Sequence, residues 1–213
     1  MNAASPEAPK NCPLCPRLAA YRAANAEQEP AWFNGPAPSF GDPNARLLIV
    51  GLAPGRTGAN RTGRPFTGDY AGVLLYGSLK KFGFGLGEYQ ADPNDGFTLS
   101  DAMITNAVRC APPENKPTPE EIRTCRRFLT ARLDALPRLK VILALGAIAH
   151  DSVLRALQMK PAQAKFAHAA ETVLPNGRTL ISSYHCSRYN TQTNRLTTEM
   201  FEAVIARAKA LLG

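Results

Sequence analysis

The sequence predicts an α/β protein, a three-layer α/β/α sandwich around a four-stranded, mainly parallel sheet. Four short apolar runs carry this prediction, because they are continuous rather than alternating, as is typical of strands buried on both faces. Helical patterns lie between these runs, and parallel strands need such crossover connections. With 213 residues, of which 45% are hydrophobic, we expect one domain over residues 1–213 that folds unaided.

The predicted elements alternate along the chain. The strands are Leu47–Leu52, Ala102–Val108, Val141–Leu145 and Thr179–Tyr184. The helices that follow them in turn are Tyr70–Phe82, Pro119–Leu133, Ala147–Leu157 and Leu196–Leu212. The second helix has the clearest start, because Thr118 predicts an N-cap and Glu121 completes a capping box. Ligands of open parallel sheets bind beyond the carboxyl ends of the strands, so we expect the site in the segments that follow them.

The formal charge of +8 indicates a polyanionic partner, although charge alone leaves basic proteins that bind no nucleic acid as an alternative. No apolar signal region precedes Cys12. The longest apolar run, Val141–Ala149, is shorter than the roughly 20 residues that span a bilayer. We therefore expect a soluble, monomeric, cytoplasmic protein with no membrane partner.

Four of the five cysteines form a candidate metal site. Cys12 and Cys15 have the C-x2-C spacing that turns two thiolates onto one ion or cluster. Cys110 and Cys125 flank the proline-rich loop of residues 111–119 and the helix start after it. Buried free thiols are the alternative, and ligand count does not separate zinc from iron–sulfur. We expect Cys186 to be a packing residue.

A glycine-rich segment, residues 51–69, follows the first predicted strand. It lacks G-x-G-x-x-G and a Walker lysine, which disfavours nucleoside-triphosphate binding. Its glycines would let the backbone approach a ligand, Phe66 could stack on a planar base, and Arg61 and Arg64 could meet phosphates. The alternative is a polar surface loop with one buried phenylalanine.

A second polar segment, residues 184–195, follows the last predicted strand. It combines hydrogen-bond donors and aromatic rings, which suits phosphate contact or a wedge between stacked bases. His185 is better placed for chemistry than His150 or His168, for which we expect structural roles. The candidate DNA contacts here are Ser187, Arg188, Tyr189, Asn190 and Arg195.

Three patterns together carry a family resemblance. They are GLAPG-x-x-GANRTGRPFTGD, which begins at Gly51, H-x-S-x-x-N-T-x-T-x-R-L-T, which begins at His185, and the cysteine spacing. With them the chain resembles the uracil-DNA glycosylase superfamily, specifically its iron–sulfur UDGb group, family five, from about Cys12 to the final helix. The resemblance implies that Cys12, Cys15, Cys110 and Cys125 bind a [4Fe–4S] cluster with a structural or DNA-positioning role.

The resemblance also implies an activity. The enzyme would flip uracil or a related damaged base out of DNA and hydrolyse its N-glycosidic bond without lyase activity, leaving an abasic site. Phe66 would stack on the flipped base, Asn106 would read the pyrimidine edge, and His185 would lie near the base O2. Asp69 would support the positive charge that develops on the sugar, or orient the water. The backbone around the base would come from Gly51, Leu52, Ala53 and Gly55.

The first loop departs from the best-known members. These carry a carboxylate and a tyrosine there, and family-four enzymes carry a glutamate, whereas this chain has Leu52, Ala53 and Gly55. Catalysis would then depend on Asp69 and His185. An open Gly55 predicts broad specificity that covers uracil, hydroxymethyluracil, ethenocytosine and hypoxanthine.

Two alternatives share these features. A non-catalytic DNA-binding iron–sulfur protein would have the same charge and cysteines, but it would not need Phe66, Asp69, Asn106 and His185 together. A glycosylase-like protein that cross-links to abasic DNA would carry an inserted basic loop. The segment Gly58-Ala59-Asn60-Arg61 shows no such insertion.

Overall fold

Six strands form the central sheet of the computed structural model, which describes residues 5–213, in the order β1-β5-β2-β6-β8-β7. Its strands are β1 Phe40–Gly41, β2 Leu47–Gly51, β5 Ala102–Asn106, β6 Val141–Leu145, β7 Glu171–Val173 and β8 Thr179–Ser183. The four central strands are parallel, and β1 and β7 add antiparallel edges. The prediction of a mainly parallel sheet is confirmed, and the count of four strands is wrong by these two edges. Both edge strands are too short to leave an apolar run in the sequence.

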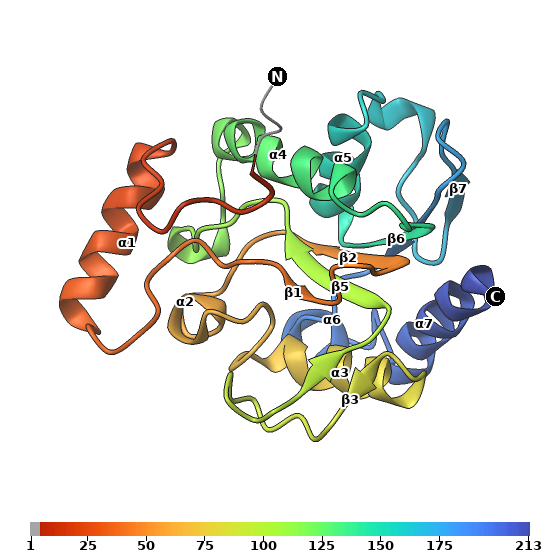
Figure 1. Cartoon of the computed structure of the whole chain (residues 1–213), viewed down its shortest axis with the longest axis horizontal. Helices are drawn as coiled ribbons and strands as arrows, with labels where there is room; N and C mark the ends of the chain where they lie inside the picture. Colours follow the sequence, from red (N-terminus) through yellow and green to blue (C-terminus); the bar gives the residue numbers. More distant parts are fainter. Residues whose placement is uncertain (1–4) are drawn as a thin grey trace.

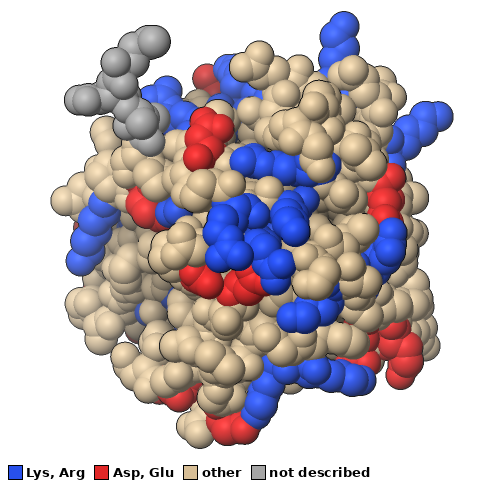
Figure 2. Space-filling view, turned by 45° about the vertical axis from the view of Figure 1, so that its right-hand side comes forward, with Lys and Arg blue, Asp and Glu red and all other residues tan. Residues whose placement is uncertain are grey.

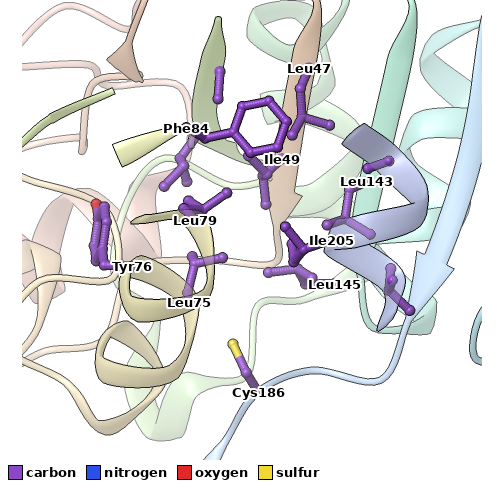
Figure 3. Close-up of a cluster of buried hydrophobic side chains, with 14 of the residues drawn as sticks. Leu47, Ile49, Leu75, Tyr76, Leu79, Phe84, Leu143, Leu145, Cys186 and Ile205 are labelled. Atoms are coloured by element: carbon purple, nitrogen blue, oxygen red, sulfur yellow. The ribbon is translucent and has the colours of Figure 1, made fainter. Parts of the chain in front are cut away.

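Helices cover both faces of this sheet (Figure 1). On one face lie α3, Tyr70–Lys81, and α7, Thr198–Leu212; on the other lie α4, Pro119–Asp134, and α5, Ala147–Ala156. Successive residues of β2 enter opposite cores, because side chains alternate across a strand. Leu47 and Ile49 pack against α3 and α7, as Figure 3 shows, and Leu48 packs against the other pair. The predicted three-layer sandwich is confirmed.

The predicted cap of α4 is present. The Thr118 hydroxyl accepts the Glu121 N–H, and the Glu121 carboxylate accepts the Thr118 N–H at 2.7 Å. The last helix starts at Thr198 rather than Leu196, because the side chain of Thr197 caps it by accepting the Met200 N–H. No helix within residues 5–213 has the length and apolar character needed to cross a bilayer.

Several short or weakly patterned elements were not predicted from the sequence. They are α1 Pro16–Gln28, α2 Ala59–Thr62, α6 Arg188–Gln192, the 3-10 turns Pro113–Asn115 and Pro161–Gln163, and a small hairpin of β3 Gly85–Leu86 with β4 Thr98–Leu99. The largest, α1, buries only Leu18 and Asn25, so it has no apolar stripe for periodicity to detect. Figure 1 shows α1 at the end of the molecule away from α7.

Candidate active site

The carboxyl ends of β2 and β5 bring Gly51 and Asn106 side by side, since these two residues are partners in the parallel register. A Cβ atom on Gly51 would lie 2.5 Å from the Asn106 Oδ1 and 2.7 Å from the Phe66 ring. Glycine at position 51 therefore lets two side chains converge that any larger residue would separate.

The Asn106 amide is buried, and its Oδ1 has no hydrogen-bond partner within residues 5–213. A buried acceptor without a donor costs about 1–3 kcal/mol. Such groups are rare in folded proteins, and a ligand that supplies a donor removes the cost. The Asn106 Oδ1 is therefore an acceptor that a donor group of a bound ligand would satisfy.

Phe66 is held in a left-handed backbone conformation, with φ of 55°. Two contacts stabilise this uncommon geometry: the Tyr89 hydroxyl donates to the Phe66 carbonyl at 3.1 Å, and Gly72 leaves room for that same carbonyl. The Phe66 ring lies nearly parallel to the His185 ring, at 5.8 Å between centroids and 27° between planes. The two rings are therefore stacked on each other beside Asn106.

Asp69 begins α3 as its N-cap, and its Oδ1 accepts the Gly72 N–H at 3.1 Å. Burial raises the pKa of this carboxyl, and the backbone hydrogen bonds oppose the rise. No positively charged side chain of residues 5–213 contributes to this pKa. A carboxylate without a counter-ion can stabilise a cation that forms beside it.

His185 follows β8 directly. The Asn190 side-chain amide donates to the His185 carbonyl at 2.8 Å, which fixes the backbone at this point. Burial lowers the pKa of His185 to about 4. The imidazole is therefore neutral near pH 7 and can donate one hydrogen bond without carrying a charge.

These side chains line one cavity of about 630 Å³ at the predicted edge of the sheet. A volume of this size is typical of small-molecule sites. The expected residues that line it are Leu52, Ala53, Gly55, Phe66, Asp69, Asn106, His185, Ser187 and Arg188. A Cβ on Gly55 would find its nearest neighbour at 3.8 Å, an ordinary van der Waals contact, so a small side chain would fit there without a clash.

Six further polar or aromatic residues line the same cavity and were not predicted: Tyr21, Arg56, Thr57, Tyr70, Glu114 and Asn115. Tyr21 comes from α1, which the sequence pattern does not reveal. Asn115 comes from the proline-rich loop, where it has a φ of 58°. Its Oδ1 would lie 3.9 Å from a Cβ on Gly55, and the Asp69 Oδ2 would lie 4.0 Å from that point, so both side chains lie beside Gly55.

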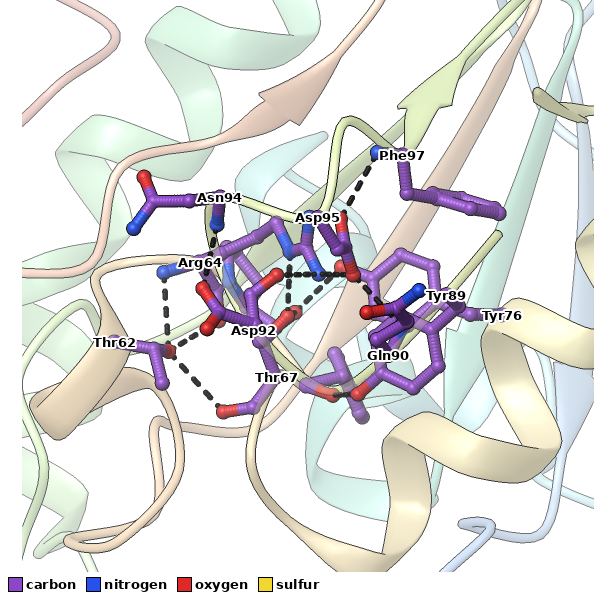
Figure 4. Close-up of polar contacts among 12 residues, drawn as sticks. Thr62, Arg64, Thr67, Tyr76, Tyr89, Gln90, Asp92, Asn94, Asp95 and Phe97 are labelled. Carbon is purple, nitrogen blue, oxygen red and sulfur yellow. Dashed lines mark hydrogen bonds and ion pairs between the residues drawn. The ribbon is translucent and has the colours of Figure 1, made fainter. Parts of the chain in front are cut away.

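The expectation that Arg64 meets phosphates is wrong. Both terminal nitrogens of Arg64 donate to Asp95 at 2.8 Å, beside the aromatic side chains of Tyr76 and Tyr89 (Figure 4). The side chain is only 5% exposed. Its guanidinium carbon lies 5.5 Å from the ring centroids of both Tyr76 and Tyr89. Arg64 therefore holds the loop together from inside and is not free to contact DNA.

The other candidate DNA contacts differ in their surroundings. Asn190 is half-buried and its amide is engaged with His185, so it orients the loop rather than facing solvent. Arg61, Arg188, Tyr189 and Arg195 are exposed, and the Arg195 guanidinium carbon lies 4.7 Å from the centroid of the Tyr184 ring. These four side chains, together with Ser187, remain available to a nucleic acid.

Positively charged side chains also gather away from this cavity. Figure 2 brings forward the side of the molecule that carries β6, β7 and α7 in Figure 1, and it shows a group of Lys and Arg side chains there. Arg46, Lys140 and Arg178 each precede one of three neighbouring strands in register. Arg46 pairs with Asp101 and, like Lys140, donates to the Leu212 carbonyl. Part of the +8 charge therefore belongs to side chains that make structural contacts at the amino edge of the sheet.

The four candidate metal ligands line one small cavity between α1 and α4. The Arg22 guanidinium donates to the Cys110 Sγ, and the Arg109 backbone N–H donates to the Cys125 Sγ, both at 3.3 Å. Burial raises the pKa of Cys15 to about 11 and that of Cys125 to about 12. In the part of the chain that the structure describes, no three His, Cys, Asp or Glu side chains lie close enough to hold a single metal ion.

The remaining cysteine and histidines are structural, as expected. Cys186 is fully buried in the core of α3 and α7. The two ring nitrogens of His150 contact the Ser182 hydroxyl at 2.7 Å and the Ala164 carbonyl at 2.8 Å. His168 stacks on Tyr184 with ring centroids 5.1 Å apart.

The fold and the cavity define a class of protein: an α/β protein with a cavity of small-molecule size at the carboxyl edge of its parallel strands. Residues 38–209 match the family model described as the uracil DNA glycosylase superfamily. The chain belongs to that superfamily. The resemblance inferred from the loop motifs is therefore confirmed.

Similar proteins described as type-5 uracil-DNA glycosylase include three from different genera. The one from Thermus thermophilus is 48% identical over 208 residues, which cover 95% of this chain and 94% of the relative. The one from Pyrobaculum aerophilum is 40% identical over 207 residues, 95% of this chain and 90% of the relative. The one from Mycobacterium bovis is 39% identical over 211 residues, 95% of this chain and 78% of the relative.

Proposed function

We propose that the protein is a monofunctional DNA-repair glycosylase that hydrolyses the N-glycosidic bond of uracil after the base leaves the duplex stack. The unpaired Oδ1 of Asn106 carries this proposal. Uracil presents an N3–H donor beside its O4 acceptor, and the Asn106 amide offers the matching acceptor and donor. The family and the names of the relatives support the same activity.

The reaction places negative charge on the departing base and positive charge on the sugar, and the cavity holds one side chain to stabilise each charge. As the C1′–N1 bond breaks, the base takes the electron pair and the sugar becomes cationic. The neutral His185 imidazole donates a hydrogen bond to the base O2, and the Asp69 carboxylate stabilises the sugar cation. Water then adds to C1′ and its proton passes to Asp69. No lysine is among the described residues that line the cavity, which favours water over an amine as the nucleophile.

Asn106→Ala tests the proposal. We expect single-turnover release of uracil to fall roughly 10²–10³-fold, because the variant loses both hydrogen bonds to the base. Asn106→Asp should fall as far, since a carboxylate keeps the acceptor but repels O4. Asn94→Ala, at an exposed asparagine that does not line the cavity, is the control and should react at the wild-type rate. Normal excision by Asn106→Ala would refute the role of this amide.

The lack of a side chain at Gly55, which lines the cavity, supports broad specificity. Hypoxanthine and hydroxymethyluracil present the same N–H donor beside a carbonyl acceptor as uracil. Ethenocytosine presents no N–H there, so we expect it to be the slowest of the four. Gly55→Tyr should fill the space and retain uracil while losing the larger bases. If the wild-type enzyme releases only uracil from a panel of these lesions, the proposal of broad specificity is wrong.

We also propose that Cys12, Cys15, Cys110 and Cys125 hold a [4Fe–4S] cluster. Four soft thiolate donors around one cavity fit this group, and two N–H groups already point at the sulfurs. When bound, the cluster would cross-link α1 to the loop that continues from Asn106.

Elemental analysis tests the cluster. Protein purified without air should be brown and contain iron and acid-labile sulfide in equal amounts. Cys125→Ser should lose colour and iron, whereas Cys186→Ser should keep both, because Cys186 lies in a separate core. Colourless protein that contains zinc would overturn the assignment.

A DNA-binding protein without catalysis is the second candidate, and the joint presence of Asp69, Asn106 and His185 in one cavity disfavours it. A covalent cross-linker of abasic DNA is disfavoured by the short Gly58–Arg61 segment. The single domain, the monomeric state and the cytoplasmic location stay predictions from the sequence.

A further inference from the structure

Tyr70 lies where two concave surfaces meet. It is the first residue of α3, directly after Asp69, and 43% of it is exposed. It lines the 630 Å³ cavity that also holds Asn106, and it lines a second groove, which runs between α3 and the start of α7. None of the base-binding or catalytic roles described above uses this side chain.

Two contacts join Tyr70 to α6. The Arg188 guanidinium carbon lies 5.2 Å from the centroid of the Tyr70 ring, and the Thr191 hydroxyl donates to the Tyr70 hydroxyl at 3.2 Å. Arg188 and Thr191 are three residues apart and so share one face of the helix. A single aromatic side chain thus contacts this face through both its ring and its hydroxyl.

The α6 helix needs such support. It has only five residues, and its N-cap is the Ser187 hydroxyl. Helices this short do not persist in water without tertiary contacts. Tyr189, which directly follows Arg188, is 70% exposed, so a large aromatic ring projects from the helix without packing against the protein.

We propose that Tyr70 is a positioning residue for DNA engagement: it docks Arg188 and Thr191 so that α6 presents Tyr189 to the gap left by the flipped base. The inference rests on the proposed function, because a gap exists only where a base has left the stack. It also links gap filling to catalysis, since Tyr70 adjoins the Asp69 carboxylate in the chain.

Gap filling matters only when the uracil begins in a duplex. We therefore expect Tyr70→Ala to lower single-turnover excision of uracil paired with guanine by roughly 10-fold, through loss of the ring contact and the hydrogen bond. Excision from a single-stranded oligonucleotide should stay within about 2-fold of wild type. Fluorescence of 2-aminopurine beside the uracil should report fewer flipped bases in the duplex at saturating protein.

Graded variants separate the two contacts. Tyr70→Phe keeps the ring under Arg188 and loses the hydroxyl, so its duplex defect should be smaller and should equal that of Thr191→Val. Val73→Ala, one turn further along α3 and 65% exposed, lines the same groove without a polar contact to α6 and should be silent.

Three results would overturn the inference: equal losses on duplex and single-stranded uracil, no loss on either, or an unchanged 2-aminopurine signal. Thermal denaturation of each variant reports whether it is folded. Failure of the proposed function is a separate result, because the wild-type protein would then release uracil from neither substrate.

Discussion

Gly58 and Asp69 fit each other closely: a Cβ atom on Gly58 would lie 2.7 Å from the Asp69 Oδ2 and 3.2 Å from the Asp69 Cβ. Glycine at position 58 therefore leaves free the space that the Asp69 side chain occupies. The two residues are the N-caps of α2 and α3, so two helix starts meet at the carboxylate.

Gly58→Ala should therefore displace Asp69. The added methyl group forces the carboxylate to rotate away from the cavity, and we expect single-turnover excision of uracil to fall by at least about 10-fold. Gly77→Ala is the control, because a Cβ there meets nothing within 4 Å. As an exposed helical position it should raise the free energy of unfolding by about 0.5–1 kcal/mol and leave excision unchanged. Equal activity of the two variants would contradict the fit.

Asp69→Asn separates the charge of this residue from its capping role. Asparagine caps helices as well as aspartate does, so the free energy of unfolding in urea should change little. Excision should fall roughly 10²–10³-fold, because the amide cannot balance the sugar cation. Asp69→Ala should lose the cap as well and unfold about 1 kcal/mol more readily. An active Asp69→Asn enzyme would show that the carboxylate charge is dispensable.

His185 predicts a pH dependence of stability. Its pKa is lowered to about 4, so between an ordinary value of about 6.5 and about 4 the unfolded chain binds a proton that the folded chain does not. Stability from this residue is complete above about 6.5 and falls as the pH drops, by up to roughly 3 kcal/mol. Urea unfolding between pH 4 and 8 should show this slope, and His185→Gln should flatten it. A slope unchanged by the substitution would argue against a neutral, buried imidazole.

The acid limit of activity follows from the same two groups. Burial raises the pKa of Asp69, so the acid limb of the pH–rate profile should lie above the ordinary range of an aspartate. His185 stays neutral down to about pH 4 and should not set this limb. In Asp69→Asn the limb should disappear from the residual rate. A limb near 6.5 that vanished in His185→Gln would reverse this assignment.

Asp95→Ala should be strongly destabilising. It leaves the buried Arg64 guanidinium without its counter-ion, and loss of one partner of a buried pair costs about 3–5 kcal/mol. Glu120→Ala, which removes the exposed pair with Arg123, should cost at most about 0.5 kcal/mol. Chemical denaturation of both variants checks the contrast. Similar stabilities would mean that the Arg64–Asp95 ion pair does not stabilise the glycine-rich loop.

The sequence alone was enough for the parts of this protein that depend on local pattern. Continuous apolar runs predicted the four central strands, and Thr118 with Glu121 predicted the start of α4. It also predicted where Phe66, Asp69, Asn106 and His185 would meet. Parallel strands end at one edge of a sheet, so residues that follow them gather there even when they are far apart in the chain.

Tertiary structure decided what depends on where distant segments meet. The sequence pattern suggested that Arg64 contacts phosphates. In the structure Arg64 pairs with Asp95, 31 residues further on, and packs against Tyr76 and Tyr89. The edge strands β1 and β7 are recognised only by their pairing with neighbouring strands, because a run of two or three residues is too short to show a hydrophobic pattern. Asn115 reaches the cavity because the proline-rich loop folds over Gly55. Burial and pairing are properties of the packed chain, so a local pattern predicts a residue's place in an element but not the neighbours that determine its role.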